Sequence, residues 1–184
     1  MFPNKFAKEG KKHGLKPRIH ANQLSVSGGV QVGVKTKAIS VDHLEAMDKD
    51  AIKSLIGSEV MPTALPGAAF YLRTSYPPAR EMLNAGLPLA IATDYNPGSA
   101  PCGNMPFMLS LACIKMRMTP EEAINATTIN TAYAMEIGDT HGTITKGKAA
   151  NLFITKEIPS YAFMPYSFGG NVIDKVILKG KVIN

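Results

Sequence analysis

The sequence has little cysteine and no long apolar run. Its only cysteines are Cys102 and Cys113, too few for a disulfide framework and not spaced as a CxxC motif. We expect both to be buried or loop thiols in a reducing compartment. No stretch approaches the roughly 18 apolar residues of a membrane-spanning helix, and no apolar segment follows the basic N-terminus as in a secretory signal. The sequence therefore predicts a soluble cytoplasmic protein without a membrane partner.

Charged residues are also few. They make up 18% of the chain against 45% apolar residues, a globular composition that excludes a disordered protein. The net charge of +6 comes mainly from basic residues near the two ends, between Lys5 and Arg18 and between Lys175 and Lys181. No recognised binding motif accompanies them, so we interpret them as solvated faces and expect no nucleic-acid partner.

Strand-like and helix-like segments alternate through the first half of the chain. This alternation predicts a parallel sheet with right-handed crossovers, hence an α/β fold. The expected helices cover 4–14, 28–35, 48–56 and 78–85, and the expected strands cover 15–20, 38–44, 59–65 and the run that ends at Asp94. Further along we expect helices over 105–116 and from Pro120 onward with Thr119 as N-cap, an ordered loop over 163–170, and β segments over 141–155 and 173–184.

Three of the four expected strands end in a residue that can bind a metal. These residues are His20, His43 and Asp94. Parallel strands place their C-terminal ends together, so the three side chains should meet at one edge of the sheet. Neutral imidazoles and a carboxylate suit a hydrolytic zinc or iron site, in which Asp94 could be both ligand and proton acceptor. A structural role for any one of them is the alternative, since a single histidine at a strand end is often only a satisfied polar residue.

The segment after Asp94 offers polar donors. Asn96, Gly98 and Ser99 present an amide, bare backbone and a hydroxyl that could hold a carboxylate or amide substrate, and Gln23 could turn back from the end of the first strand. A plain Asn-Pro-Gly turn is an equally weighted reading of the same residues.

Several segments, in order, carry a family resemblance. RIHANQLSVSGG, SVDHLE, LPGAAFYLR, ATDYNPGSAP, MTPEEAINATTINTAYA and HGTITKGKAANLFI closely resemble the C-terminal half of the imidazolonepropionase family, histidine-degradation enzymes of the amidohydrolase superfamily. The resemblance covers essentially the whole chain. The Asp-x-Asn-Pro-Gly segment, with His20 and Gln23 upstream, is specific to this family.

The resemblance implies roles for individual residues. His20 and Asp94 match ligands of a single zinc or iron ion. His43 matches a histidine that points at the attacking water and stabilises the forming oxyanion, and Asp94 matches the residue that moves the proton.

The substrate contacts are carried over in the same way. Gln23 and Ser99 match substrate-contacting positions, and Asn96 and Gly98 match positions that bind the product, N-formimidoyl-L-glutamate. Arg73 matches a recurrent arginine that could contact an anionic substrate.

The implied fold is the C-terminal half of a (β/α)8 TIM barrel, about strands 5 to 8, with strands of a small composite β-sandwich domain. We expect a partial barrel domain over 1–138 and part of the small β domain over 139–184. The superfamily's first-strand His-x-His pair is absent, and neither His13 nor His141 replaces it; His141 is expected in a turn. We therefore expect the isolated chain to be inactive and to need an N-terminal half or self-association. The parent family is expected to be homodimeric.

The leading function is metal-dependent hydrolysis of the cyclic amide 4-imidazolone-5-propanoate to N-formimidoyl-L-glutamate. Two alternatives stay open. The chain could come from another amidohydrolase, a cyclic amidase or a deaminase, or it could be a non-catalytic truncated barrel that serves as a binding module.

Overall fold

The structure, a computed structural model, describes residues 2–183. Its larger sheet has four parallel strands whose spatial order is their order along the chain. The predicted parallel sheet is thus confirmed. The strands are β1 (Arg18–Ala21), β2 (Ser40–His43), β3 (Met61–Ala64) and β4 (Ala90–Ile91).

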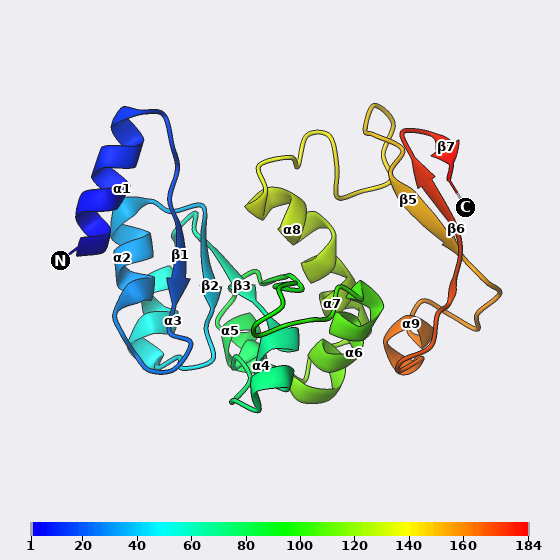
Figure 1. Cartoon of the computed structure of the whole chain (residues 1–184), viewed down its shortest axis with the longest axis horizontal. Coiled ribbons are helices and arrows are strands. Elements are labelled where there is room, and N and C mark those ends of the chain that lie inside the picture. The colour runs from blue at the N-terminus through cyan, green and yellow to red at the C-terminus, as the bar shows by residue number, and fades with distance from the viewer. Residues whose placement is uncertain (1, 184) are drawn as a thin grey trace.

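Helices connect these strands and form a layer beside the sheet (Figure 1). Those nearest their predicted places are α1 (Phe2–Lys12), α2 (Gly29–Thr36), α3 (Lys49–Leu55), α5 (Ala79–Asn84) and α6 (Met105–Lys115). The Asp48 carboxylate caps α3 by accepting the Ala51 N–H at 2.7 Å, which explains why that helix begins there.

The sequence prediction missed some helices and their limits. A helix α4 (Pro66–Leu72) starts directly after β3 with proline in its first turn, where no backbone N–H is needed. The helix expected from Pro120 is capped by Thr119 as predicted but divides at Thr128 into α7 (Pro120–Thr127) and α8 (Ile129–Ala134). The segment expected to be an ordered loop contains the short helix α9 (Phe163–Tyr166).

One face of the sheet packs against helices to form the main core. Its side chains alternate along the strands with those of the opposite face, and α2 contacts β1 and β2 while α7 contacts β4. Val41 and Ile91 on this outer face are fully buried, as is Leu89 just before β4. The core therefore lies between the outer face of the sheet and its helices.

Gly33 brings α2 close to the sheet. A Cβ at this position would lie 2.4 Å from Cγ1 of Val41, well inside contact distance. We expect Gly33→Ala to destabilise the protein by about 1–3 kcal/mol through overpacking, although alanine is the better helix former. Urea unfolding measures this difference.

Gly10→Ala in α1 is the matched control for that substitution. Its nearest neighbour would be Cβ of Leu15 at 3.6 Å, an ordinary contact. We expect it to be neutral or stabilising by about 0.5–1 kcal/mol. Equal losses in the two variants would contradict a steric role for Gly33.

The C-terminal part forms a separate small sheet at the end of the molecule opposite α1 (Figure 1). Its antiparallel strands lie in the order β5-β6-β7, with bounds β5 (Leu152–Thr155), β6 (Ile173–Leu178) and β7 (Lys181–Val182). The β segment expected over 141–155 is thus a strand only from Leu152, and turns precede it. The connection is anchored to the helices, because the Ser110 hydroxyl donates to the Pro165 carbonyl at 2.7 Å.

The structure shows the state of the two cysteines and the lengths of the helices. Cys102 and Cys113 are free and half-buried, the first in a loop and the second in α6. Among the helices of residues 2–183, none has the length and apolar character needed to cross a membrane.

Candidate active site

The second face of the sheet, its inner face, is polar along β1, β2 and β3. Residues at the same level of neighbouring parallel strands share a face, and the strand register aligns His20 with Asp42 and Asp42 with Thr63. Two residues nearer the start of the strands, on the same face, Arg18 aligns with Ser40. A row of ionisable and hydroxyl side chains therefore runs across the sheet below its C-terminal edge.

His43 reaches this inner face because β2 ends in an unusual backbone conformation. Its alternation with Asp42 would place it on the outer face, but its φ is +84° and that of Leu44 is +71°. The centroid of its ring lies 4.0 Å from that of His20, at a tilt of 41°. Only 5% of His43 is exposed, whereas His20 on the edge strand is open to solvent.

Asp94 completes the group at the C-terminal edge. It follows β4 by three residues, has a φ of +53° and is half-buried. A cavity of about 310 Å³ is lined by His20, His43 and Asp94 together with Asp42 and Thr63. The structure thus brings together the three strand-end residues that the sequence singled out.

The floor of this cavity comes from α8. Thr131 lines it and donates to the Ile91 carbonyl at 3.2 Å, and the Asn130 side-chain amide donates to the Leu89 carbonyl at 2.9 Å. Ala134 packs against Met61 and Ala90 on the inner face. This helix therefore closes the cavity from the side of the strands' N-terminal ends.

The loop after Asp94 is closed on itself. The Asn96 side-chain oxygen accepts the backbone N–H groups of Gly98 at 2.9 Å and Ser99 at 2.8 Å, and its amide donates to the Asp94 carbonyl at 2.6 Å. These are the hydrogen bonds of a local turn, the alternative weighed from the sequence. Binding of a ligand by Asn96, Gly98 and Ser99 stays a prediction, and in this conformation those donors are already engaged.

The remaining residues singled out by the sequence lie elsewhere. Gln23 is half-buried in the turn after β1, outside the described lining of the cavity, and Arg73 is exposed at the C-terminal end of α4. His13 is exposed near Glu9. His141 sits in a bend, as expected, with its Nε2 3.0 Å from the Asn151 side-chain amide.

Sequence reasoning overlooked the inner-face residues beneath the strand ends. Arg18, Ser40, Asp42 and Thr63 occupy alternating positions of their strands, and that period of two is the signal that could have identified them. Arg18 also donates to the carbonyl of Ala134, which links β1 to α8.

Asp42 is the inner-face group with a shifted pKa. Burial raises the pKa of its carboxyl above the ordinary 3.8, against the lowering effects of the Ser40 hydroxyl and the Arg18 guanidinium. The folded protein therefore holds this proton more tightly than the unfolded chain. The stability that this carboxyl contributes is therefore fully present below pH 3.8. It is lost as the pH rises through the raised pKa of the folded state.

We expect Asp42→Asn, which has no proton to lose, to gain stability relative to the original chain as pH rises from about 3.5 to about 7. The melting temperature should shift by about 2–4 °C for each 1 kcal/mol relieved. Thermal unfolding followed by circular dichroism at several pH values measures this. Asp174→Asn, at an exposed residue of β6, is the control, and a variant curve parallel to the original at all pH values would contradict the prediction.

The ligand atoms at His20 and Asp94 are of types that bind zinc or iron, but they are too few for a complete site. His20 offers an imidazole and Asp94 a carboxylate, both suitable for either metal. Within residues 2–183, however, no group of three or more histidine, cysteine, aspartate or glutamate side chains is arranged to hold an ion. The described residues therefore supply part of a ligand set.

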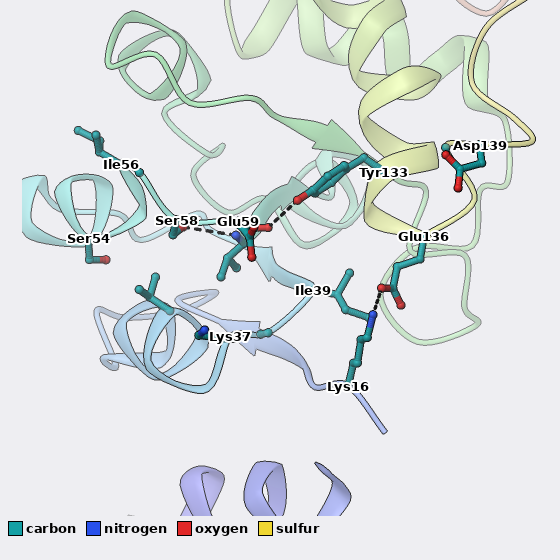
Figure 2. Close-up of a pocket in the computed structure, with 15 residues that line it drawn as sticks. Lys16, Lys37, Ile39, Ser54, Ile56, Ser58, Glu59, Tyr133, Glu136 and Asp139 are labelled. Atoms are coloured by element: carbon teal, nitrogen blue, oxygen red, sulfur yellow. Dashed lines mark hydrogen bonds and ion pairs between the residues drawn. The ribbon is translucent and has the colours of Figure 1, made fainter. Parts of the chain in front are cut away.

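A larger hollow lies at the opposite ends of the strands. It measures about 1020 Å³ and is bordered by the ion pair of Lys16 with Glu136 and by the Tyr133 hydroxyl, which donates to the Glu59 carbonyl at 3.2 Å (Figure 2). None of the strand-end residues lines the described part of this hollow. The chemistry is therefore concentrated in the smaller cavity.

Comparison with known proteins gives consistent results. The sequence pattern of the amidohydrolase family matches residues 5–183. The chain is 61% identical over 173 residues to the imidazolonepropionase of Christiangramia forsetii, covering 94% of this chain and 42% of that protein. It is 59% identical over 179 residues to that of Flavobacterium johnsoniae, covering 97% of this chain and 44% of that protein. The chain thus spans less than half the length of these relatives.

The fold also resembles solved structures. A zinc-bound adenosine deaminase from Xanthomonas campestris superposes with a TM-score of 0.79 at 17% identity, covering 97% of this chain and 47% of that one. At this identity the likeness concerns the fold alone.

Proposed function

The chain belongs to the amidohydrolase family, and on that basis we propose that it forms part of a hydrolase that opens 4-imidazolone-5-propanoate to N-formimidoyl-L-glutamate. The identity to imidazolonepropionases over nearly the whole chain supports this substrate. The observation that carries the proposal is the meeting of His20, His43 and Asp94 in one cavity at the C-terminal edge of a parallel sheet, where α/β barrels place their chemistry.

In the proposed reaction, water attacks the ring carbonyl and the carbon–nitrogen bond of the cyclic amide breaks. Asp94 accepts a proton from the attacking water and passes it to the leaving nitrogen. His43 donates a ring N–H to the oxyanion that forms on the former carbonyl oxygen. Gln23, Asn96, Gly98 and Ser99 are proposed to contact substrate or product, which requires the turn at Asn96 to exchange some of its internal hydrogen bonds for ligand contacts.

We also propose that His20 and Asp94 belong to the ligand set of one zinc or iron ion, with the other ligands supplied from outside the residues described. Such an ion, when bound, lowers the pKa of water toward 7. The parts of the barrel and of the small β domain that this chain does not supply would come from the rest of a longer protein or from a separate N-terminal half. The assembled enzyme is proposed to be a cytoplasmic homodimer.

The test is reconstitution. The chain is combined with the part of the Christiangramia forsetii relative that lies outside the matched region, and formation of N-formimidoyl-L-glutamate is followed by chromatography with zinc or iron present. We expect product from the combination and none from either piece alone. Absence of product from a complex in which both pieces co-elute would overturn this function. A parallel assay with other cyclic amides and with aminated rings distinguishes the other amidohydrolase activities.

A further inference from the structure

Glu45 is a buried carboxylate next to His43. Its Oε1 lies 3.4 Å from Nδ1 of His43, and the two side chains are 2% and 6% exposed. Among residues 2–183 its second oxygen, Oε2, has no hydrogen-bond partner. Because burying a carboxylate without partners is costly, a carboxylate held against one imidazole nitrogen calls for an explanation.

A strained backbone turn fixes the position of this carboxylate. His43 and Leu44 both adopt positive φ, a conformation that costs a non-glycine residue roughly 1–3 kcal/mol. The turn is held by the neighbouring strand end, since the N–H of Leu44 donates to the Ala21 carbonyl at 3.1 Å and that of Ala46 to the Asn22 carbonyl at 2.7 Å. Leu44 is fully buried in the core. The strained turn therefore fixes Glu45 and His43 relative to each other.

We propose that Glu45 is a positioning residue for His43: its carboxylate accepts the Nδ1–H of the ring and leaves Nε2 as the nitrogen available to the reaction. A histidine whose one nitrogen is bonded to a carboxylate has its tautomer and ring orientation set by that bond. In the neutral ring Nε2 then accepts a hydrogen bond from water, and in the protonated ring its N–H donates to an oxyanion. The role of Nε2 in a reaction rests on the proposed function. The contact between Glu45 and His43 is independent of that function.

The test reads the tautomer of His43 directly. The chain contains four histidines, so long-range ¹H–¹⁵N correlation spectra of ¹⁵N-histidine-labelled protein are readily assigned, with His43→Gln removing the signal of interest. Spectra are recorded with chelator and without substrate at about pH 8.5, well above the ordinary histidine pKa of about 6.5. We expect His43 in the Nδ1–H form, whereas the exposed His13, whose Nε2 faces the Glu9 carboxylate at 3.9 Å, gives a contrasting ring in the same spectrum.

Substitutions at Glu45 separate positioning from packing. Glu45→Leu fills similar space without an acceptor, and we expect His43 to lose its preference for the Nδ1–H form. Glu45→Gln keeps an acceptor oxygen, and we expect it to retain most of the Nδ1–H form. If Glu45→Leu fails to fold, the spectrum of the original chain still decides.

An Nε2–H tautomer in the original chain would overturn the assignment, as would an unchanged Nδ1–H tautomer in a folded Glu45→Leu. Because no turnover is measured, the outcome is independent of reconstitution. If His43 is held in the Nδ1–H tautomer but the assembled protein does not hydrolyse the substrate, only the proposed function is rejected. If the assembled protein hydrolyses the substrate but His43 is not held in that tautomer, only the positioning role of Glu45 is rejected.

Discussion

Asp94→Asn is expected to lower kcat of the reconstituted hydrolase by about 10²–10⁴-fold, the range typical for loss of a general acid–base group. The amide cannot accept the proton of the attacking water, so product formation should fall. KM should change less, because no substrate contact is assigned to this side chain. Steady-state hydrolysis of 4-imidazolone-5-propanoate by the assembled protein measures both constants.

Asp174→Asn is the matched control for this experiment, because it makes the same chemical change at an exposed position of β6. It should leave kcat unchanged. A folded Asp94→Asn protein that keeps full kcat would show that another group moves the proton.

Leu89→Ala is expected to destabilise the chain by about 2–5 kcal/mol, the usual cost of truncating a fully buried leucine. Leu89 has no exposed surface, lies in the core between the sheet and its helices, and precedes the strand that leads to Asp94. Urea denaturation followed by circular dichroism measures the change in free energy of unfolding. A loss of this size is a large part of the total stability of an ordinary domain.

The same substitution at an exposed leucine provides the control. Leu24 is 80% exposed after β1, and Leu24→Ala should change the free energy of unfolding by no more than about 0.5 kcal/mol. Similar losses at both positions would contradict the assignment of Leu89 to the core.

The sequence predicted the parallel sheet well because its signals are local. Apolar runs of strand length separated by helical patterns are visible without knowledge of contacts, and so are caps such as Thr119. The edge rule for parallel strands then led to His20, His43 and Asp94, which the structure places around one cavity.

Features that depend on contacts between distant residues escaped the prediction. The division of the predicted helix at Thr128 accompanies hydrogen bonds from Asn130 to the Leu89 carbonyl and from Thr131 to the Ile91 carbonyl, some 40 residues away. Helix α4 begins with Pro66 and Gly67, a pair that in a sequence is typical of a turn. Glu45 could not be predicted as a partner of His43, because no sequence pattern indicates that His43 and Leu44 both adopt positive φ angles.

The polarity of the inner face contrasts with the apolar packing of the outer face, and this division has a practical consequence for protein engineering. Changes chosen to raise heat resistance can be confined to α2, α3 and the strand positions they cover, such as Val41, without altering a side chain that lines the cavity. Libraries aimed at new substrates can instead vary inner-face positions such as Thr63. The two kinds of library can therefore be screened separately and their best members combined in one gene, with little interference expected where the changed residues share no contact.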